Sequence, residues 1–216
     1  MSLSTPRVKG IYLVIDPSTE KNKLLNQLKS ALRGGVDLVQ IWNHWPINAT
    51  LTYKIRLIND LKKLIIPYGI PLLINEDWQL LCKTGLDGVH FDEIPQNIDQ
   101  IRKEIGKPVL LGLTCSNDLQ PISWAAQHNF DYISFCSVFP SASVSSCEIV
   151  KPESIQQARK LTTIPIFLSG GILLDNLNSL GSYKIQGIAL ISGIMDAISP
   201  EIAARKYRSE LQILNQ

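Results

Sequence analysis

Residues 166–194 read IFLSGGILLDNLNSLGSYKIQGIALISGI and contain two short apolar runs, each followed by glycine and by a stretch that can form a helix. Eight runs of this kind occur along the chain, at residues 11–15, 36–41, 72–75, 88–91, 109–114, 132–135, 166–169 and 188–192. Eight alternating units of strand and helix predict a closed parallel (β/α)8 or TIM barrel of the α/β class. The active site of such a barrel lies where the strands end.

An open, doubly wound parallel sheet is the alternative architecture, because alternation alone does not decide whether a sheet closes. The first run is not followed by the Gly-x-Gly-x-x-Gly pattern, and the eight units are evenly spaced, which favours the barrel. The 216 residues contain no linker or shift of composition. We therefore expect a single barrel domain over residues 1–216, with its core at about residues 10–205.

Apolar residues recur with helical spacing between several of the runs. This spacing predicts helices over residues 24–32, 55–64 and 98–105. Further helices are expected to begin near Asp118, Pro152, Leu174 and Pro200. Residues 140–150 contain four serines and no apolar period, and we expect them to form a mobile loop over the mouth of the barrel.

The composition indicates a soluble globular domain and gives no sign of a nucleic-acid or membrane partner. The chain is 45% apolar and 19% charged, with a formal net charge of +2. This charge gives no argument for binding nucleic acid or a membrane surface. No signal peptide or apolar span is visible in the sequence, so we expect a soluble cytoplasmic protein.

The four cysteines lack the spacing of a zinc site or a disulfide framework, which favours a reducing compartment. Cys115 and Cys136 lie in or beside predicted strands and are expected to be small core residues. A nucleophilic role for Cys115, which follows Thr114 at a strand end, is the alternative.

Glycines follow the last two predicted strands. Gly170 and Gly171 come after one strand, and Ser192 and Gly193 come at the end of the next. In barrels the loops after these two strands often bind phosphate through backbone N–H groups, and glycine lets the anion approach the backbone. A tight turn without a ligand is the alternative, but two neighbouring glycine-bearing strand ends favour a phosphate site.

Several short motifs occur together in a recognisable order. They are Tyr12-Leu13-Val14-Ile15-Asp16, Gly34-Gly35-Val36-Asp37-Leu38-Val39-Gln40, Leu73-Ile74-Asn75, Gly85-Leu86-Asp87-Gly88-Val89-His90, Leu111-Gly112-Leu113-Thr114, Asp131-Tyr132-Ile133-Ser134, Val138-Phe139-Pro140-Ser141, Gly170-Gly171-Ile172 and Ala189-Leu190-Ile191-Ser192-Gly193-Ile194. Through them the chain resembles the thiamine-phosphate synthase and thiazole tautomerase superfamily over nearly its whole length.

The resemblance implies a transferase of thiamine biosynthesis that acts on small phosphorylated heterocycles. In the synthase reaction a hydroxymethylpyrimidine diphosphate ionises, and the nitrogen of a thiazole phosphate captures the carbocation as pyrophosphate leaves. The resemblance implies that Gln40, Asn75 and Thr114 contact the pyrimidine and the diphosphate, and that Glu76 and Asp92 hold Mg²⁺. It also implies phosphate contacts from Ser141, Ser143, Gly170, Gly171, Ser192 and Gly193.

The chain departs from the family pattern at its charged positions. Trp42 and His44 stand where the family has arginine and lysine, and Pro95 stands where it has a metal-binding aspartate. Val144 replaces a lysine of the sixth loop, and Lys151, a few residues later, could restore one positive charge. A diphosphate needs charge-assisted partners. The sequence therefore predicts that the diphosphate end of the site has lost charged residues, whereas the monophosphate end keeps the residues expected there.

Two other functions stay open at this stage. The tautomerase branch acts on the thiazole phosphate without a metal, but its usual histidine position is Ser137 here, so His44 is the substitute acid–base group. The alternative for His44 is a structural residue stacked beside Trp42 and Trp45. The third possibility is a protein that binds a phosphorylated ligand without turnover.

Overall fold

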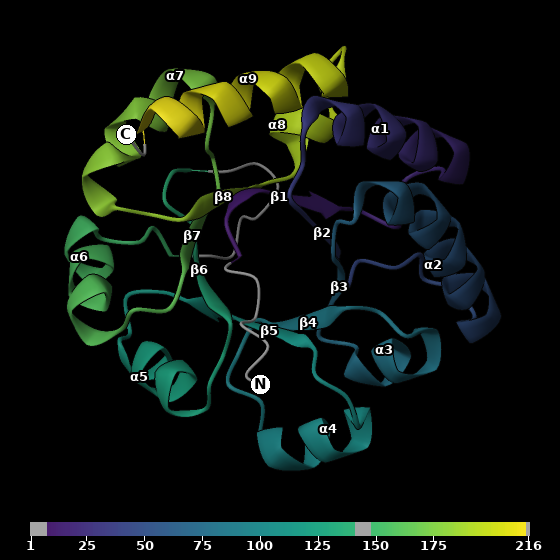
Figure 1. Ribbon diagram of the computed structural model, residues 1–216, viewed down its shortest axis with the longest axis horizontal. Helices are drawn as coiled ribbons and strands as arrows, with labels where there is room; N and C mark the ends of the chain where they lie inside the picture. Colours follow the sequence, from purple (N-terminus) through teal and green to yellow (C-terminus); the bar gives the residue numbers. More distant parts are fainter. Residues whose placement is uncertain (1–7, 141–147, 215–216) are drawn as a thin grey trace.

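The computed structural model describes residues 8–140 and 148–214. Its eight parallel strands follow one another in sequence order, and β8 pairs with β1, so the sheet closes (Figure 1). This closure confirms the barrel and excludes the open sheet. The strands are β1 (Gly10–Ile15), β2 (Leu38–Ile41), β3 (Leu72–Asn75), β4 (Gly88–Phe91), β5 (Leu110–Cys115), β6 (Tyr132–Cys136), β7 (Ile166–Ser169) and β8 (Gly187–Leu190).

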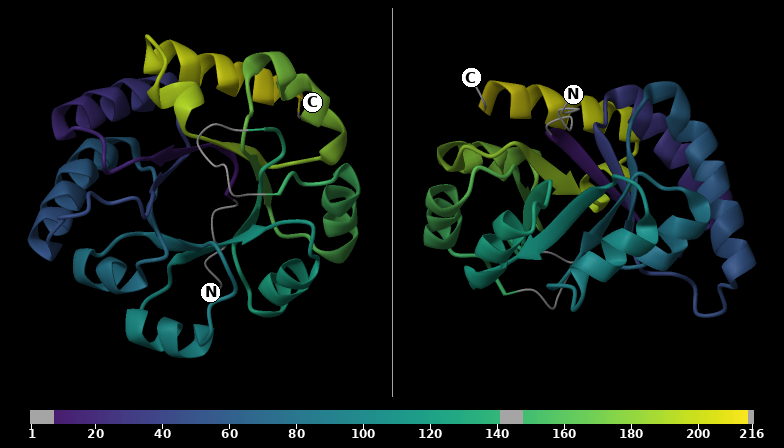
Figure 2. Two further views of the ribbon diagram at one scale, coloured as in Figure 1. Left: turned by 180° about the vertical axis from the view of Figure 1, so that it is seen from behind. Right: turned by 60° about the horizontal axis from the view of Figure 1, so that its bottom comes forward.

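Helices surround the strands as an outer ring, which Figure 2 shows from behind and in a tilted view. The helices are α1 (Lys21–Gly34), α2 (Leu51–Ile65), α3 (Trp78–Thr84), α4 (Ile98–Ile105), α5 (Gln120–Gln127), α6 (Pro152–Leu161), α7 (Leu174–Leu177), α8 (Ser192–Met195) and α9 (Pro200–Leu214), with 3-10 turns η1 (Ile66–Tyr68) and η2 (Asn178–Tyr183). Among the described residues no helix is both long enough and apolar enough to cross a bilayer.

Most of the predicted elements are present, with shifted ends. The predicted strand 36–41 begins only at Leu38, because Asp37 is used in a contact at the start of the strand. The predicted strand 188–192 ends at Leu190, because Ser192 already begins α8. Helix α3 has only seven residues, too few for a helical period to show in the sequence.

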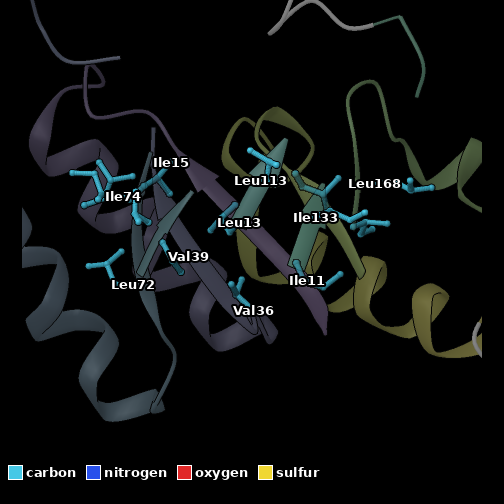
Figure 3. Close-up of a cluster of buried hydrophobic side chains, with 14 of the residues drawn as sticks. Ile11, Leu13, Ile15, Val36, Val39, Leu72, Ile74, Leu113, Ile133 and Leu168 are labelled. Carbon is cyan, nitrogen blue, oxygen red and sulfur yellow. The ribbon is translucent and has the colours of Figure 1, made fainter. Parts of the chain in front are cut away.

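Alternate residues of each strand face opposite sides of the barrel wall. On β1, Ile11, Leu13 and Ile15 belong to the buried cluster between strands and helices, part of which Figure 3 shows. Tyr12 belongs to a second cluster, which also contains Leu38. Since side chains alternate along a strand, the second cluster fills the inside of the barrel.

The inside of the barrel changes from apolar to polar toward the carboxyl ends of the strands. Leu73 and Phe167 belong to the interior cluster, and two residues further along the same strands come Asn75 and Ser169. The period of two keeps each pair on the same side of the sheet. The apolar lower layers hold the barrel together, and the polar upper layer forms the floor of a site.

A repeated contact closes the opposite end of the barrel. One polar residue precedes each even-numbered strand, and its side-chain oxygen accepts the backbone N–H of the strand before it, at 2.8–2.9 Å. Its own N–H donates back to the carbonyl of that same residue. The four pairs are Asp37 with Ile11, Asp87 with Leu72, Asp131 with Leu111 and Gln186 with Ile166. The barrel is therefore a fourfold repeat of a unit with two strands.

Replacing Asp131 with alanine tests the strength of this contact. The half-buried Leu111 N–H would lose its side-chain acceptor, which we expect to lower the free energy of unfolding by about 1–3 kcal/mol. Asp131→Asn keeps an oxygen acceptor and should lose much less. Urea unfolding of both variants measures the difference. Equal losses would show that the acceptor oxygen is not what stabilises this end of the barrel.

Candidate active site

A cavity of about 640 Å³ opens at the carboxyl ends of the strands. All eight strands, or the residues that follow them, contribute to its wall. The lining residues are Tyr12, Val14, Gln40, Trp42, Asn75, His90, Asp92, Glu93, Thr114, Ser134, Cys136, Pro140, Ser169, Gly170, Gly171, Ile172, Leu173, Ala189, Leu190, Ile191, Ser192 and Gly193. The volume is within the range of small-molecule sites.

Glycines form one wall of the cavity because side chains would not fit there. Gly170 and Gly171 have positive φ angles of 87° and 62°. A Cβ on Gly170 would lie 1.8 Å from the Ser137 hydroxyl, and a Cβ on Gly171 would lie 2.4 Å from the carbonyl of Pro140. This packing leaves the backbone beside the cavity uncovered. The structure thus places Gly170, Gly171, Ser192 and Gly193 along one cavity, as the phosphate prediction requires.

A chain of polar groups forms the floor. The Tyr12 hydroxyl donates to Gln40 Oε1 and lies 2.9 Å from the Tyr132 hydroxyl. His90 Nδ1 lies 3.0 Å from the same Tyr132 hydroxyl, and His90 Nε2 lies 2.8 Å from Thr114 Oγ1. Each of these side chains comes from a different strand. Five strands are therefore linked in one continuous network under the cavity.

The histidine of this network is neutral. Burial lowers the pKa of His90 to about 3, because a charged imidazole would lose its hydration without gaining a carboxylate partner. Its two nitrogens then serve as one donor and one acceptor. A general acid–base role near neutral pH would need a pKa close to that pH, so His90 orients its neighbours.

Carboxylates gather at the ends of β3 and β4. Glu76 Oε1 accepts the backbone N–H of Asp92, which brings the two residues side by side. Burial raises the pKa of Asp92, while hydrogen bonds from Asn75 and Thr114 lower it and the charge of Glu93 raises it. Burial also raises the pKa of Glu76. Among the described residues, no three His, Cys, Asp or Glu side chains form a cluster that could enclose a metal ion.

The chain matches the model of the thiamine monophosphate synthase family over residues 11–194. The chain belongs to this family. It is 28% identical to the thiamine-phosphate synthase of Methanobrevibacter smithii over 206 residues, which cover 95% of this chain and 97% of that protein. It is 30% identical to that of Xylella fastidiosa, covering 96% of this chain and 87% of that protein.

A solved structure supports the same fold. The chain superposes on a thiamine phosphate pyrophosphorylase from Pyrococcus furiosus with a TM-score of 0.81. The two sequences are 21% identical, and the match covers 96% of this chain and 97% of the other. The barrel and its closure are thus those of the thiamine monophosphate synthase family.

The described lining of the cavity is poor in cations. The described lining residues include two carboxylates, Asp92 and Glu93, but neither lysine nor arginine. Trp42, where the family resemblance leads us to expect an arginine, lines the cavity. Trp45 and Trp78 do not line the cavity and pack partly buried against the hydrophobic core.

Three predicted residues, Glu76, His44 and Lys151, lie outside the lining of the cavity. His44 is exposed beside the mouth, where its Nδ1 lies 3.0 Å from Asp16 Oδ2 and its ring stands 4.9 Å from that of Trp42. Lys151 is exposed just before α6, and its backbone N–H donates to Asn117. Ser141 and Ser143 lie outside the described residues.

Two tyrosines in or beside the site are not predicted by the sequence. The sequence motifs contain Tyr12 and Tyr132 but assign neither a role, although Tyr12 lines the cavity and the Tyr132 hydroxyl lies beside the hydroxyl of Tyr12 and the ring of His90. The available signal in the sequence is that each tyrosine lies on a predicted strand, two or more residues before a polar residue near the end of that strand. Cys115 is a core residue, since it is buried and burial raises its thiol pKa to about 12.

Proposed function

We propose that this chain is a thiamine-phosphate synthase, which joins hydroxymethylpyrimidine diphosphate to thiazole phosphate. In this reaction the C–O bond between the pyrimidine methylene and the diphosphate breaks, and pyrophosphate leaves with the electron pair. The thiazole nitrogen then donates its lone pair to the methylene carbon and becomes a thiazolium. The observation that carries the proposal is one cavity, in a chain of this family, that joins a glycine wall to a polar floor.

The two ends of the cavity would bind the two substrates. Backbone N–H groups at Gly171, Ser192 and Gly193 would hold the thiazole phosphate, because glycine lets the anion reach the backbone. At the other end, Gln40, Asn75 and Thr114 would bind the pyrimidine and its diphosphate. This arrangement would hold the thiazole nitrogen close to the pyrimidine methylene, which is the main requirement for capture of a short-lived carbocation.

The carboxylates Glu76 and Asp92 fit the Mg²⁺ that the family resemblance implies. Mg²⁺ is usually held by one or two carboxylates together with substrate phosphates and water. Glu76 and Asp92 are adjacent, and the charge of Asp92 adds to burial in raising the pKa of Glu76, a repulsion that a divalent cation would relieve. When bound there, the ion would neutralise charge on the departing pyrophosphate.

The decisive assay supplies purified protein with both substrates and Mg²⁺. We expect thiamine phosphate and pyrophosphate to form in equal amounts, and omission of Mg²⁺ to stop the reaction. The cation-poor lining favours one second candidate, a protein that binds thiazole phosphate without turnover. Calorimetry with thiazole phosphate alone would identify that candidate if no product forms at high protein concentration.

Restoring the family's charges should increase the synthase rate. The double variant Trp42→Arg with His44→Lys adds two cations near the diphosphate end, and we expect kcat/KM for the pyrimidine diphosphate to rise at least about tenfold. The matched control, Ile47→Arg with Asn48→Lys, adds the same charge at two exposed positions of the same loop that do not line the cavity. An equal rise in both variants would assign the effect to general electrostatic attraction.

A further inference from the structure

We propose that Asn176, which does not line the cavity, is a positioning residue for the phosphate end of the site. Its side-chain amide holds the Gly171 carbonyl away from the cavity, and the Ile172 N–H is thereby directed toward the cavity as a donor to a phosphate. The identity of the ligand rests on the proposed function, whereas the orientation of the backbone does not.

The side chain of Asn176 uses both ends of its amide on the loop after β7. Its Nδ2 donates to the Gly171 carbonyl at 2.9 Å, and its Oδ1 accepts the N–H of Leu173, also at 2.9 Å. An amide that donates at one end and accepts at the other fits this loop in only one orientation. Asn176 lies on α7 and is half-buried. The Gly171 carbonyl is therefore held from outside the cavity.

The two neighbouring carbonyls of the loop are held in the same way. The carbonyl of Gly170 accepts the N–H of Phe139 at 3.1 Å. The carbonyl of Ile172 accepts the hydroxyl of Tyr207, on α9, at 3.3 Å. Three consecutive carbonyls thus have protein donors, and none of the three donor residues belongs to the described lining of the cavity. The loop is fixed along its outer side.

The N–H groups of these peptides face the opposite way. In a trans peptide the N–H points away from the direction of the preceding residue's carbonyl, and the peptides of this loop are trans. The Ile172 N–H therefore points away from Asn176. Ile172 lines the cavity, although its side chain packs in the buried cluster between strands and helices. The backbone of Ile172 is thus the part that adjoins the cavity.

The Ile172 N–H needs an acceptor from outside the chain. Ile172 is buried, and within residues 8–140 and 148–214 neither its N–H nor that of Gly171 has an acceptor. Buried backbone N–H groups are nearly always paired, so we expect the partner to come from the cavity. Phosphate oxygens accept hydrogen bonds from several backbone N–H groups at once. This mode of binding suits a described lining without lysine or arginine.

Two substitutions of Asn176 distinguish positioning from other roles. Asn176→Asp keeps an acceptor for the Leu173 N–H but places a second acceptor against the Gly171 carbonyl. Asn176→Ala removes both hydrogen bonds and adds no charge. A role limited to the start of α7 would be lost only in Asn176→Ala, and an effect of charge would appear only in Asn176→Asp. The matched control, Asn178→Asp, adds the same charge at an exposed position two residues further along.

Calorimetry with thiazole phosphate, and with the thiazole alcohol that lacks the phosphate, measures the effect. We expect both Asn176 variants to bind thiazole phosphate at least about tenfold more weakly, because a hydrogen bond to a charged group is lost. Binding of the alcohol should not change, and Asn178→Asp should bind both compounds as the unaltered protein does. A loss in only one of the two Asn176 variants, or an equal loss for the alcohol, would overturn the positioning role.

Inorganic phosphate tests the orientation of the backbone without a substrate. In two-dimensional ¹⁵N–¹H spectra of the whole protein, we expect the amide signal of Ile172 to shift as phosphate is added. The shift should be lost in Asn176→Ala and retained in Asn178→Asp. An Ile172 signal that does not respond to phosphate in the unaltered protein, or that responds equally in Asn176→Ala, would contradict the proposal.

These tests and the synthase assay can fail independently. A protein whose Ile172 amide responds to phosphate through Asn176, but which forms no thiamine phosphate, would retain the positioning role and lose the proposed function. An active synthase in which both Asn176 variants bind thiazole phosphate as tightly as the unaltered protein would retain the function and exclude the positioning role.

Discussion

Replacing Ser192 with aspartate is expected to weaken binding of thiazole phosphate at least about a hundredfold, because two like charges about 4 Å apart repel by about 4 kcal/mol at a protein surface. Ser192 lines the cavity as the first residue of α8. An aspartate there would face the phosphate directly if the glycine wall is the phosphate site. The side chain differs from asparagine only by its charge, so Ser192→Asn is the matched control and should bind within a few-fold of the unaltered protein.

The fold should tolerate this change. A carboxylate is favourable in the first turn of a helix, and Ser192 is partly exposed, so we expect no loss in the free energy of unfolding. Calorimetry with thiazole phosphate and urea unfolding of both variants separate binding from stability. Equal affinities of Ser192→Asp and Ser192→Asn would place the phosphate elsewhere in the cavity and remove Ser192 and Gly193 from the proposed site.

The parts of the site that the sequence could predict are local. Glycine directly after a strand, as at Gly171 and Gly193, is visible in the sequence without knowledge of its distant neighbours. Polar residues at the carboxyl ends of strands, such as Asn75 and Thr114, necessarily meet at one rim of a parallel barrel. Both predictions need only the strand pattern and the rule that active sites lie at that rim.

Other parts depend on contacts between distant segments. Tyr132 reaches His90 across the strand between them, so neither residue alone predicts the link. His44 follows a strand end but turns to Asp16, because a loop can direct a side chain away from the rim. The polar residue before every even strand, from Asp37 to Gln186, was visible in the spacing, but its meaning required the register of the sheet.

Gly112→Ala is expected to affect the whole network. Gly112 lies on β5, where the register places it between His90 on β4 and Tyr132 on β6. The rings of His90 and Tyr132 stack across it. A Cβ at Gly112 would lie 2.2 Å from Tyr132 Cζ and 2.5 Å from His90 Nδ1. Both rings are buried, so neither can move aside without disturbing its own neighbours.

We expect Gly112→Ala to lower the free energy of unfolding by about 1–3 kcal/mol through overpacking. The synthase rate should fall about a hundredfold, because a displacement of about 1 Å in positioning residues can cost that much. Gly181→Ala is the matched control: the nearest atom to its Cβ would be the end of the Leu214 side chain, at 3.2 Å. Urea unfolding and steady-state kinetics measure both effects.

A second substitution, added to Gly112→Ala, distinguishes the effect of overpacking from the loss of the Tyr132 hydrogen bonds. Gly112→Ala with Tyr132→Leu gives the added methyl group room, so we expect part of the lost stability to return. The rate should stay low, because leucine cannot form hydrogen bonds with His90 or Tyr12. Recovery of the rate together with the stability would mean that the network only fills space. Recovery of stability alone would show that the rate depends on the hydrogen bonds of the Tyr132 hydroxyl to Tyr12 and His90.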